Sequence, residues 1–122
     1  MASRNQQVGA ETFRQIALSF PHTTEEPHVH LASFRVEQRK FATLDEEKNR
    51  GCLLLNLPDQ AVFCDFDKSI IYPVPNKFGN EGFTYFELSK VPKSLLYNAM
   101  ELAYNRILDK IATAKAKRKR NK

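Results

Sequence analysis

Cysteine, glycine and tryptophan are scarce in this sequence of 122 residues, which contains two cysteines, four glycines and no tryptophan. Cys52 and Cys64 lie in separate apolar runs without a Cys-x-x-Cys spacing, which argues against a disulfide framework or a zinc ribbon and favours buried free thiols. The few glycines form neither a GxxxxGK(S/T) phosphate loop nor a GxGxxG dinucleotide loop. The nucleotide-binding classes built on those loops are therefore not indicated.

Long apolar runs are absent as well. No segment approaches the roughly 18 consecutive apolar residues of a membrane-spanning helix. The first eleven residues, MASRNQQVGAE, have no apolar stretch of the kind found in signal peptides. These absences predict a cytoplasmic protein without a membrane partner.

Positive charge is abundant but unevenly distributed. The whole chain carries a net charge of +5, yet residues 1–109 hold 12 basic and 14 acidic residues and are therefore net negative. The remaining seven basic residues fall between Lys110 and Lys122, where there is no acid. We therefore divide the chain into a single domain, residues 1–114, and a basic C-terminal tail, residues 115–122, which is expected to be frayed helix or disordered.

Hydrophobic periodicity predicts three helices and five strands. The helices are expected at 9–20, 58–67 and from Pro92 to Ala114, and the strands at 33–38, 40–45, 52–57, 70–74 and 83–88. Residues 22–27 are expected to be a polar connector, and the continuous apolar run at 52–57 indicates a central strand covered on both faces. Most connections are too short for crossover helices, so the strands should pair antiparallel. The predicted fold is one compact α+β domain with about five antiparallel strands, flanking helices, and the order α-β-β-β-α-β-β-α.

The predicted core consists of the apolar residues on the inward faces of these elements. It contains Phe13, Ile16, Phe34, Phe41, Leu53, Leu55, Phe63, Phe86, Leu96, Ala99, Ala103 and Ile107. Val62 and Phe66 are expected on the buried side of the second helix, together with Ala61 and Phe63.

One spacing in the chain is of the metal-binding kind, His28-Val29-His30. On a strand, residues two apart face the same side, so two imidazoles can converge on one ion. A zinc site needs three or four ligands, however, and no third ligand stands at a recognisable spacing. We therefore predict no metal. Because no catalytic motif such as GxSxG is present, we also predict no catalytic residues.

The stretch PVPNKFGNEGFTY, residues 73–85, is rich in proline, asparagine and glycine. This composition is typical of a long hairpin turn, since glycine supplies positive φ and asparagine bonds its own backbone. The turn does not require Lys77 at its tip. The Arg39-Lys40 pair holds a similar place at the hairpin between 33–38 and 40–45. Two basic hairpins on a small sheet are able to grip a duplex backbone as wings do.

Three stretches of the sequence resemble the MmcQ/YjbR family. They are HLASFRVEQRKFATL at 30–44, PNKFGNEGF at 75–83, where the family commonly has tryptophan at one of the phenylalanines, and LLYNAMELAY at 95–104. With the first helix, the resemblance spans roughly residues 9–108. It implies a secretion-chaperone-like α+β fold with an antiparallel sheet, no cofactor and no catalytic residues. It also implies DNA binding through a "double wing", with the wings at Arg39 and Lys40 and at Asn76 and Lys77.

We therefore expect a DNA-binding module whose wings contact the phosphate backbone. The basic tail would act as an electrostatic arm, through Lys115, Lys117, Arg118, Lys119 and Arg120. Another class remains open, a protein-interaction or chaperone-like adaptor module, which would expose an apolar patch. A third, an enzyme or a small-ligand binder, would need an apolar pocket with converging polar groups.

Overall fold

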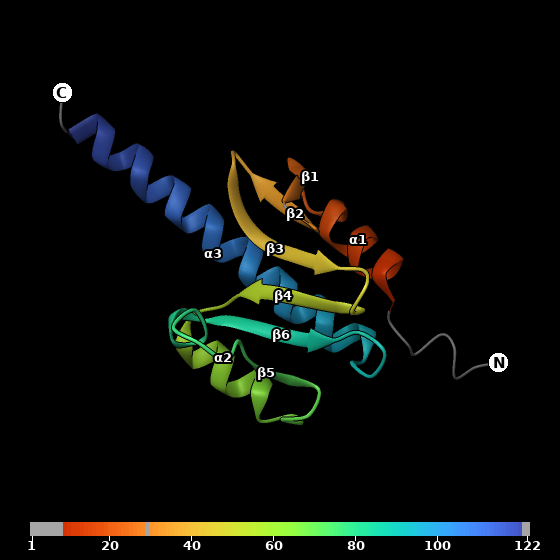
Figure 1. Cartoon of the computed structure of the whole chain (residues 1–122). Coiled ribbons are helices and arrows are strands. Elements are labelled where there is room, and N and C mark those ends of the chain that lie inside the picture. The colour runs from red at the N-terminus through yellow and green to blue at the C-terminus, as the bar shows by residue number, and fades with distance from the viewer. Residues whose placement is uncertain (1–8, 29, 121–122) are drawn as a thin grey trace.

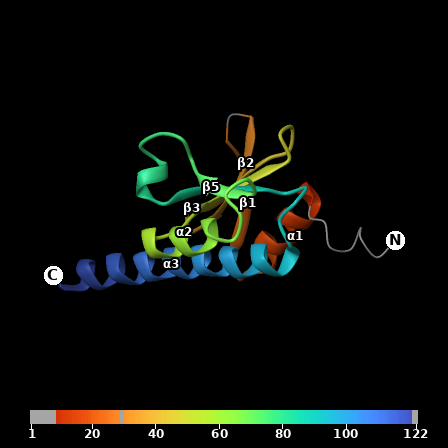
Figure 2. The same cartoon turned by 90° about the horizontal axis from the view of Figure 1, so that it is seen from below.

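An antiparallel sheet of six strands carries three α-helices on one of its faces (Figures 1 and 2). The computed structural model describes residues 9–28 and 30–120, without the side chains of His28, Lys119 and Arg120. The elements are α1 Ala10–Ser19, β1 Thr23–His28, β2 Leu31–Val36, β3 Arg39–Asp45, β4 Arg50–Leu54, α2 Leu57–Cys64, β5 Ile71–Pro73, the short 3-10 helix η2 Gly79–Glu81, β6 Phe83–Glu87 and α3 Lys93–Arg120.

The strand order in the sheet is β1-β2-β3-β4-β6-β5, and every neighbouring pair is antiparallel. The first four strands form a meander. The chain then crosses through α2 to the far edge, makes β5 there, and returns with β6 between β4 and β5. The predicted single α+β domain and the order of its predicted elements are confirmed.

The sheet has one strand more than the five that were predicted. This additional strand is β1, and it lies where the sequence predicted a polar connector. Its residues, TTEEPH, have no apolar alternation, and it is an edge strand that pairs only with β2. Pro27 is compatible with this place because an edge strand needs fewer backbone donors than a central one. This segment is a strand because of its hydrogen bonds to β2, and its side chains contribute no hydrophobic pattern.

Coverage of the sheet is one-sided. Figure 2 shows α1, α2 and α3 below the sheet, and no α-helix above it among the described residues. The prediction that residues 52–57 would be covered on both faces is therefore wrong. In β4, Gly51 and Leu53 are buried under the helices, whereas Cys52 and Leu54 are only partly buried on the opposite side, which we call the open face.

All twelve predicted core residues are buried. Phe41 owes its place to a bulge: Phe34 pairs with Ala42 and Arg35 with Lys40, so Phe41 has no partner opposite it in β2. Phe41 and Ala42 are consequently both buried, although they are neighbours in a strand. The Phe41 ring packs edge-on against Tyr104 of α3, with ring centroids 5.6 Å apart.

The second helix is rotated from the predicted orientation. Asn56 caps it, its side-chain oxygen accepting a hydrogen bond from the Asp59 N–H at 2.8 Å, and Gln60, Phe63 and Cys64 face inward. Val62 is 69% exposed and Phe66, which lies beyond the end of the helix, is 52% exposed. Ala61 is exposed as well, so the prediction that Ala61, Val62 and Phe66 are buried is wrong, because Gln60 takes the inward position.

The last helix is longer than predicted. Its apolar stripe runs from Leu96 to Ile111, the last buried residue, but the helix itself continues to Arg120. Its C-terminal part extends beyond the sheet (Figure 1). Most of the predicted tail is therefore a helical extension of the domain.

Candidate nucleic-acid interface

The tip of the β2–β3 hairpin lies at Glu37 and Gln38, two residues before the predicted Arg39-Lys40 tip. Glu37 has φ 48° and Gln38 φ 70°, as the central residues of a two-residue type I′ turn require. Neither is glycine or asparagine, so the usual sequence signal of this turn is absent. As a result, Arg39 and Lys40 belong to β3 and point to opposite faces of the sheet, because neighbouring strand residues alternate.

Arg39 lies on the helix side, where it pairs with the buried Val36 and borders α3. Two adjoining hollows of about 410 and 400 Å³ meet at Arg39 and Ala114. We call their combined surface the basic groove. It is lined by Glu37, Arg39, Arg106, Asp109, Lys110, Ile111, Thr113, Ala114, Lys117 and Arg118.

The charge in the basic groove is predominantly positive, since five of these residues are cations and two are acids. Glu37 is already engaged, because its carboxylate accepts a hydrogen bond from Lys115 Nζ at 3.2 Å. The pKa of the Lys110 ammonium lies below its usual value. Loss of solvation is the main cause, and repulsion by the Arg106 and Arg39 charges adds to it. The cations of the groove are thus close enough to act on one another.

Lys40, by contrast, lies on the open face with Phe83, at a hollow of only about 10 Å³, which has room for about one water molecule. The Phe83 ring packs edge-on against Phe78 at 5.6 Å, and Lys77 Nζ lies 5.5 Å from the centre of the Phe78 ring. The Asn76 side-chain oxygen accepts a hydrogen bond from the Phe78 N–H at 2.8 Å and so shapes the turn. The predicted site residues whose side chains are described therefore form two groups, one at the groove and one on the open face, whereas the side chains of the predicted Lys119 and Arg120 lie outside the described part of the chain.

The loop between β5 and β6, residues 74–82, is a hairpin connection, as predicted. Gln60 of α2 reaches into it and donates hydrogen bonds from Nε2 to the Gly79 and Phe83 carbonyls at 2.9 and 3.2 Å. Gly82 has φ +113°, and a Cβ at this position would stand 1.8 Å from the Leu55 carbonyl oxygen. Glycine at position 82 therefore allows the backbone of the loop to lie close to the backbone at Leu55.

The rest of the open face is balanced in charge. Arg50 lies over the Tyr85 ring, 3.9 Å from the ring centre to the guanidinium carbon, and neighbours Glu87 in the β4–β6 register. Tyr72 donates a short hydrogen bond to Glu87.

Burial raises the pKa of the Cys52 thiol on the open face to about 11, so this thiol is a poor nucleophile at neutral pH. Both cysteines are free thiols.

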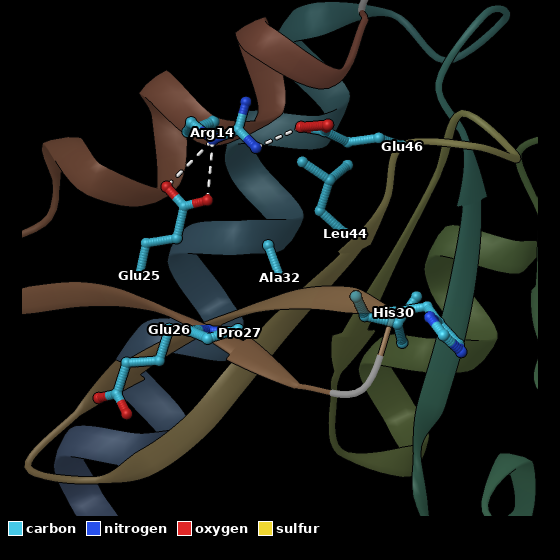
Figure 3. A pocket seen from close by; sticks show the side chains of 9 residues that line it. Arg14, Glu25, Glu26, Pro27, His30, Ala32, Leu44 and Glu46 are labelled. Carbon is cyan, nitrogen blue, oxygen red and sulfur yellow. Dashed lines mark hydrogen bonds and ion pairs between the residues drawn. The ribbon is translucent and has the colours of Figure 1, made fainter.

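A second large hollow, of about 470 Å³, lies between α1 and β1 and was not predicted. Figure 3 shows Arg14 at its wall with Glu25 and Glu46 pointing toward it, while Glu26 points away. Arg14 Nε bonds both oxygens of Glu25 at 3.0 Å, Nη1 bonds Glu11 at 3.1 Å, and Nη2 bonds Glu46. These hydrogen bonds, that to Glu46 first, raise the pKa of Arg14. The guanidinium joins α1 to β1 and to the β3–β4 turn, and the surrounding acids disfavour anions.

Within residues 9–28 and 30–120, no group of three or more histidine, cysteine or acidic side chains is arranged to hold a metal ion, and His30 has an exposed place at the hollow beside Arg14. None of the helices in the same ranges combines the length and hydropathy that a membrane span requires.

Comparison with protein-family models and with curated proteins gave no match. The fold is similar to that of the crystal structure of Deinococcus radiodurans protein DR2400, whose domain is described as DUF419. The TM-score is 0.68, the sequence identity is 19%, and the match covers 80% of this chain and 77% of that chain. At this identity the similarity establishes the α+β fold alone.

Proposed function

We propose that this chain is a DNA-binding module that holds the phosphate backbone mainly in the basic groove between β3 and α3. The observation that carries the proposal is the position of Arg39. The fold brings this residue of the first predicted wing beside Arg106, Lys110, Lys117 and Arg118 of α3, far away in sequence. A groove with five cations and two acids gives the local positive potential that a polyanion needs, although residues 1–109 are net negative.

The resemblance of the sequence to the MmcQ/YjbR family and its double wing supports this assignment. The β5–β6 loop, with Lys77, and the free end of α3 lie at the same end of the molecule in both views (Figures 1 and 2). The loop would act as a second, weaker contact, and the helical tail would extend the groove along the duplex. The proposed module binds without catalysing a reaction.

A second candidate function, a protein-interaction module, is favoured by the outer side of α2. Leu57, Val62 and Phe66 are all more than half exposed there, at 52%, 69% and 52%. Exposed apolar side chains of this size are found on docking surfaces. This assignment takes first place if the chain fails to bind DNA even at low salt.

A matched pair of substitutions tests the proposed groove. Arg39→Gln should weaken binding to a labelled duplex about fivefold at about 0.15 M salt and make the slope of log K against log[salt] shallower by about 0.9, the effect of one lost phosphate contact. Lys77→Gln removes the same charge from the β5–β6 loop and should change the affinity less than about twofold. The measurement is a fluorescence-anisotropy titration at several salt concentrations.

An equal loss in both variants would contradict the groove as the main contact. A polyglutamate peptide of matched charge is the control ligand, because it offers negative charge without a nucleic acid backbone. If the chain binds this peptide more tightly than it binds the duplex, an acidic protein partner replaces DNA in the assignment.

A further inference from the structure

Arg106 differs from the other cations of the basic groove in its burial. Its Nη1 atom is buried and has no hydrogen-bond partner among the described residues. Only two other buried side-chain polar atoms in the described part of the chain share this condition, Thr23 Oγ1 and Arg50 Nε. The Arg50 guanidinium is nevertheless placed by the Tyr85 ring beneath it. For Arg106, the described part of the protein supplies no acceptor, although buried donors nearly always have one.

The surroundings of Arg106 supply further donors. On α3, Arg106, Lys110, Thr113 and Lys117 follow one another at helical spacing and line one wall of the same hollow, and Arg39 of β3 also lines it. The hollow has a volume of about 410 Å³ and contains one acid, Asp109. Loss of solvation lowers the pKa of Lys110, and repulsion from the Arg106 and Arg39 charges adds to this shift, so these three cations lie close enough to share one anion. An oxyanion in the hollow would relieve this repulsion, and the Arg106 side chain would turn to bring its unpaired donor to that oxyanion.

We propose that Arg106 is the centre of a discrete phosphate-binding site, in which its guanidinium, with Lys110 and Arg39 beside it, binds one phosphate group of a bound nucleic acid. This inference rests on the proposed function. It adds that one phosphate contact in the groove depends on the shape of the arginine side chain as well as on its charge. A guanidinium presents a planar fork of donors that matches two phosphate oxygens, whereas an ammonium acts as a point charge. Lysine at position 106 would therefore keep the charge and lose the fork.

The charge-conserving variant Arg106→Lys separates a discrete site from diffuse attraction. We expect it to weaken duplex binding about tenfold, the effect of losing a charge-assisted hydrogen bond, while the salt slope stays unchanged. The control Arg35→Lys makes the same change away from the basic groove, at a residue of β2 whose Nε donates a hydrogen bond to Ser33 Oγ at 3.0 Å, and should stay within about twofold of the original chain. Equal affinities for all three proteins would overturn the site.

A second measurement on the unmodified chain does not depend on DNA or on the folding of a variant. Inorganic phosphate is titrated while the arginine side-chain N–H signals are followed by NMR. The Arg106 signal should shift with saturation and that of Arg14, which is bonded to three acids, should not. If phosphate saturates the Arg106 signal but the chain does not bind the duplex, the phosphate site is supported and the proposed function is contradicted. Duplex binding that is insensitive to Arg106→Lys, with no response to phosphate, would remove the site and leave the proposed function.

Discussion

A chain that ends at Ala114 is expected to bind duplex DNA about 10³-fold more weakly than the full chain at about 0.15 M salt. The truncation removes six cations, Lys115, Lys117, Arg118, Lys119, Arg120 and Lys122, of which Lys115 is already paired with Glu37. If about four of them neutralise phosphates, the slope of log K against log[salt] should become shallower by about 3.6. The measurement is the same anisotropy titration at several salt concentrations.

The truncated chain should fold unchanged, which makes the comparison fair. Ile111 is the last buried residue of α3, and the side chains of residues 115–118 are exposed. Thermal melting followed by circular dichroism should give a midpoint close to that of the full chain. If the truncated chain melts normally and binds the duplex as tightly as the full chain does, the helical tail has no role in binding.

Replacing Phe41 by alanine is expected to lower the free energy of unfolding by about 3–5 kcal/mol. The Phe41 ring is 1% exposed and packs against Tyr104, whose hydroxyl in turn donates a hydrogen bond to the Pro21 carbonyl at 2.7 Å. Removing the ring leaves a cavity between the bulge in β3 and α3, where two elements meet and neither can easily collapse. Urea denaturation of both proteins measures the difference.

Phe66→Ala is the matched control, because this ring is 52% exposed and should contribute less than about 0.5 kcal/mol. A loss below about 1 kcal/mol for Phe41→Ala would mean that the bulge does not turn this ring into the core. The strand would then be shifted by one residue, which reverses the faces of every side chain in it.

The core of the fold was predictable because it follows from periodicity. The stripe of α3 and the alternation in β2 place their apolar residues regardless of the rest of the chain. β1 was not predictable, because TTEEPH is defined only by its hydrogen bonds to β2. The orientation of α2 was missed for a similar reason: Gln60 is polar, yet it is buried because Gly79, Phe83 and Thr84 supply its acceptors from elsewhere in the chain.

The candidate site was predictable only in part. The sequence identified Arg39 and the basic tail as separate features, and it gave no sign that they adjoin. Arg106 and Lys110 were missed, although their four-residue spacing, with Lys117 seven residues after Lys110, marks a basic stripe on one side of the helix. That Arg39 faces the groove while Lys40 faces the open side depends on the turn at Glu37 and Gln38, which has no sequence signal of its own.

The most direct test of the central claim is to map the contact surface by NMR while a short DNA duplex is added to the full chain at low salt. The proposal predicts that the largest amide shifts fall at Glu37, at Arg39 and along residues 106–118, the parts of the chain that contribute side chains to the basic groove. Shifts at Lys77 and Phe78 should be smaller. Shifts confined to the outer side of α2, around Val62 and Phe66, or no shifts at all at low salt, would contradict the account.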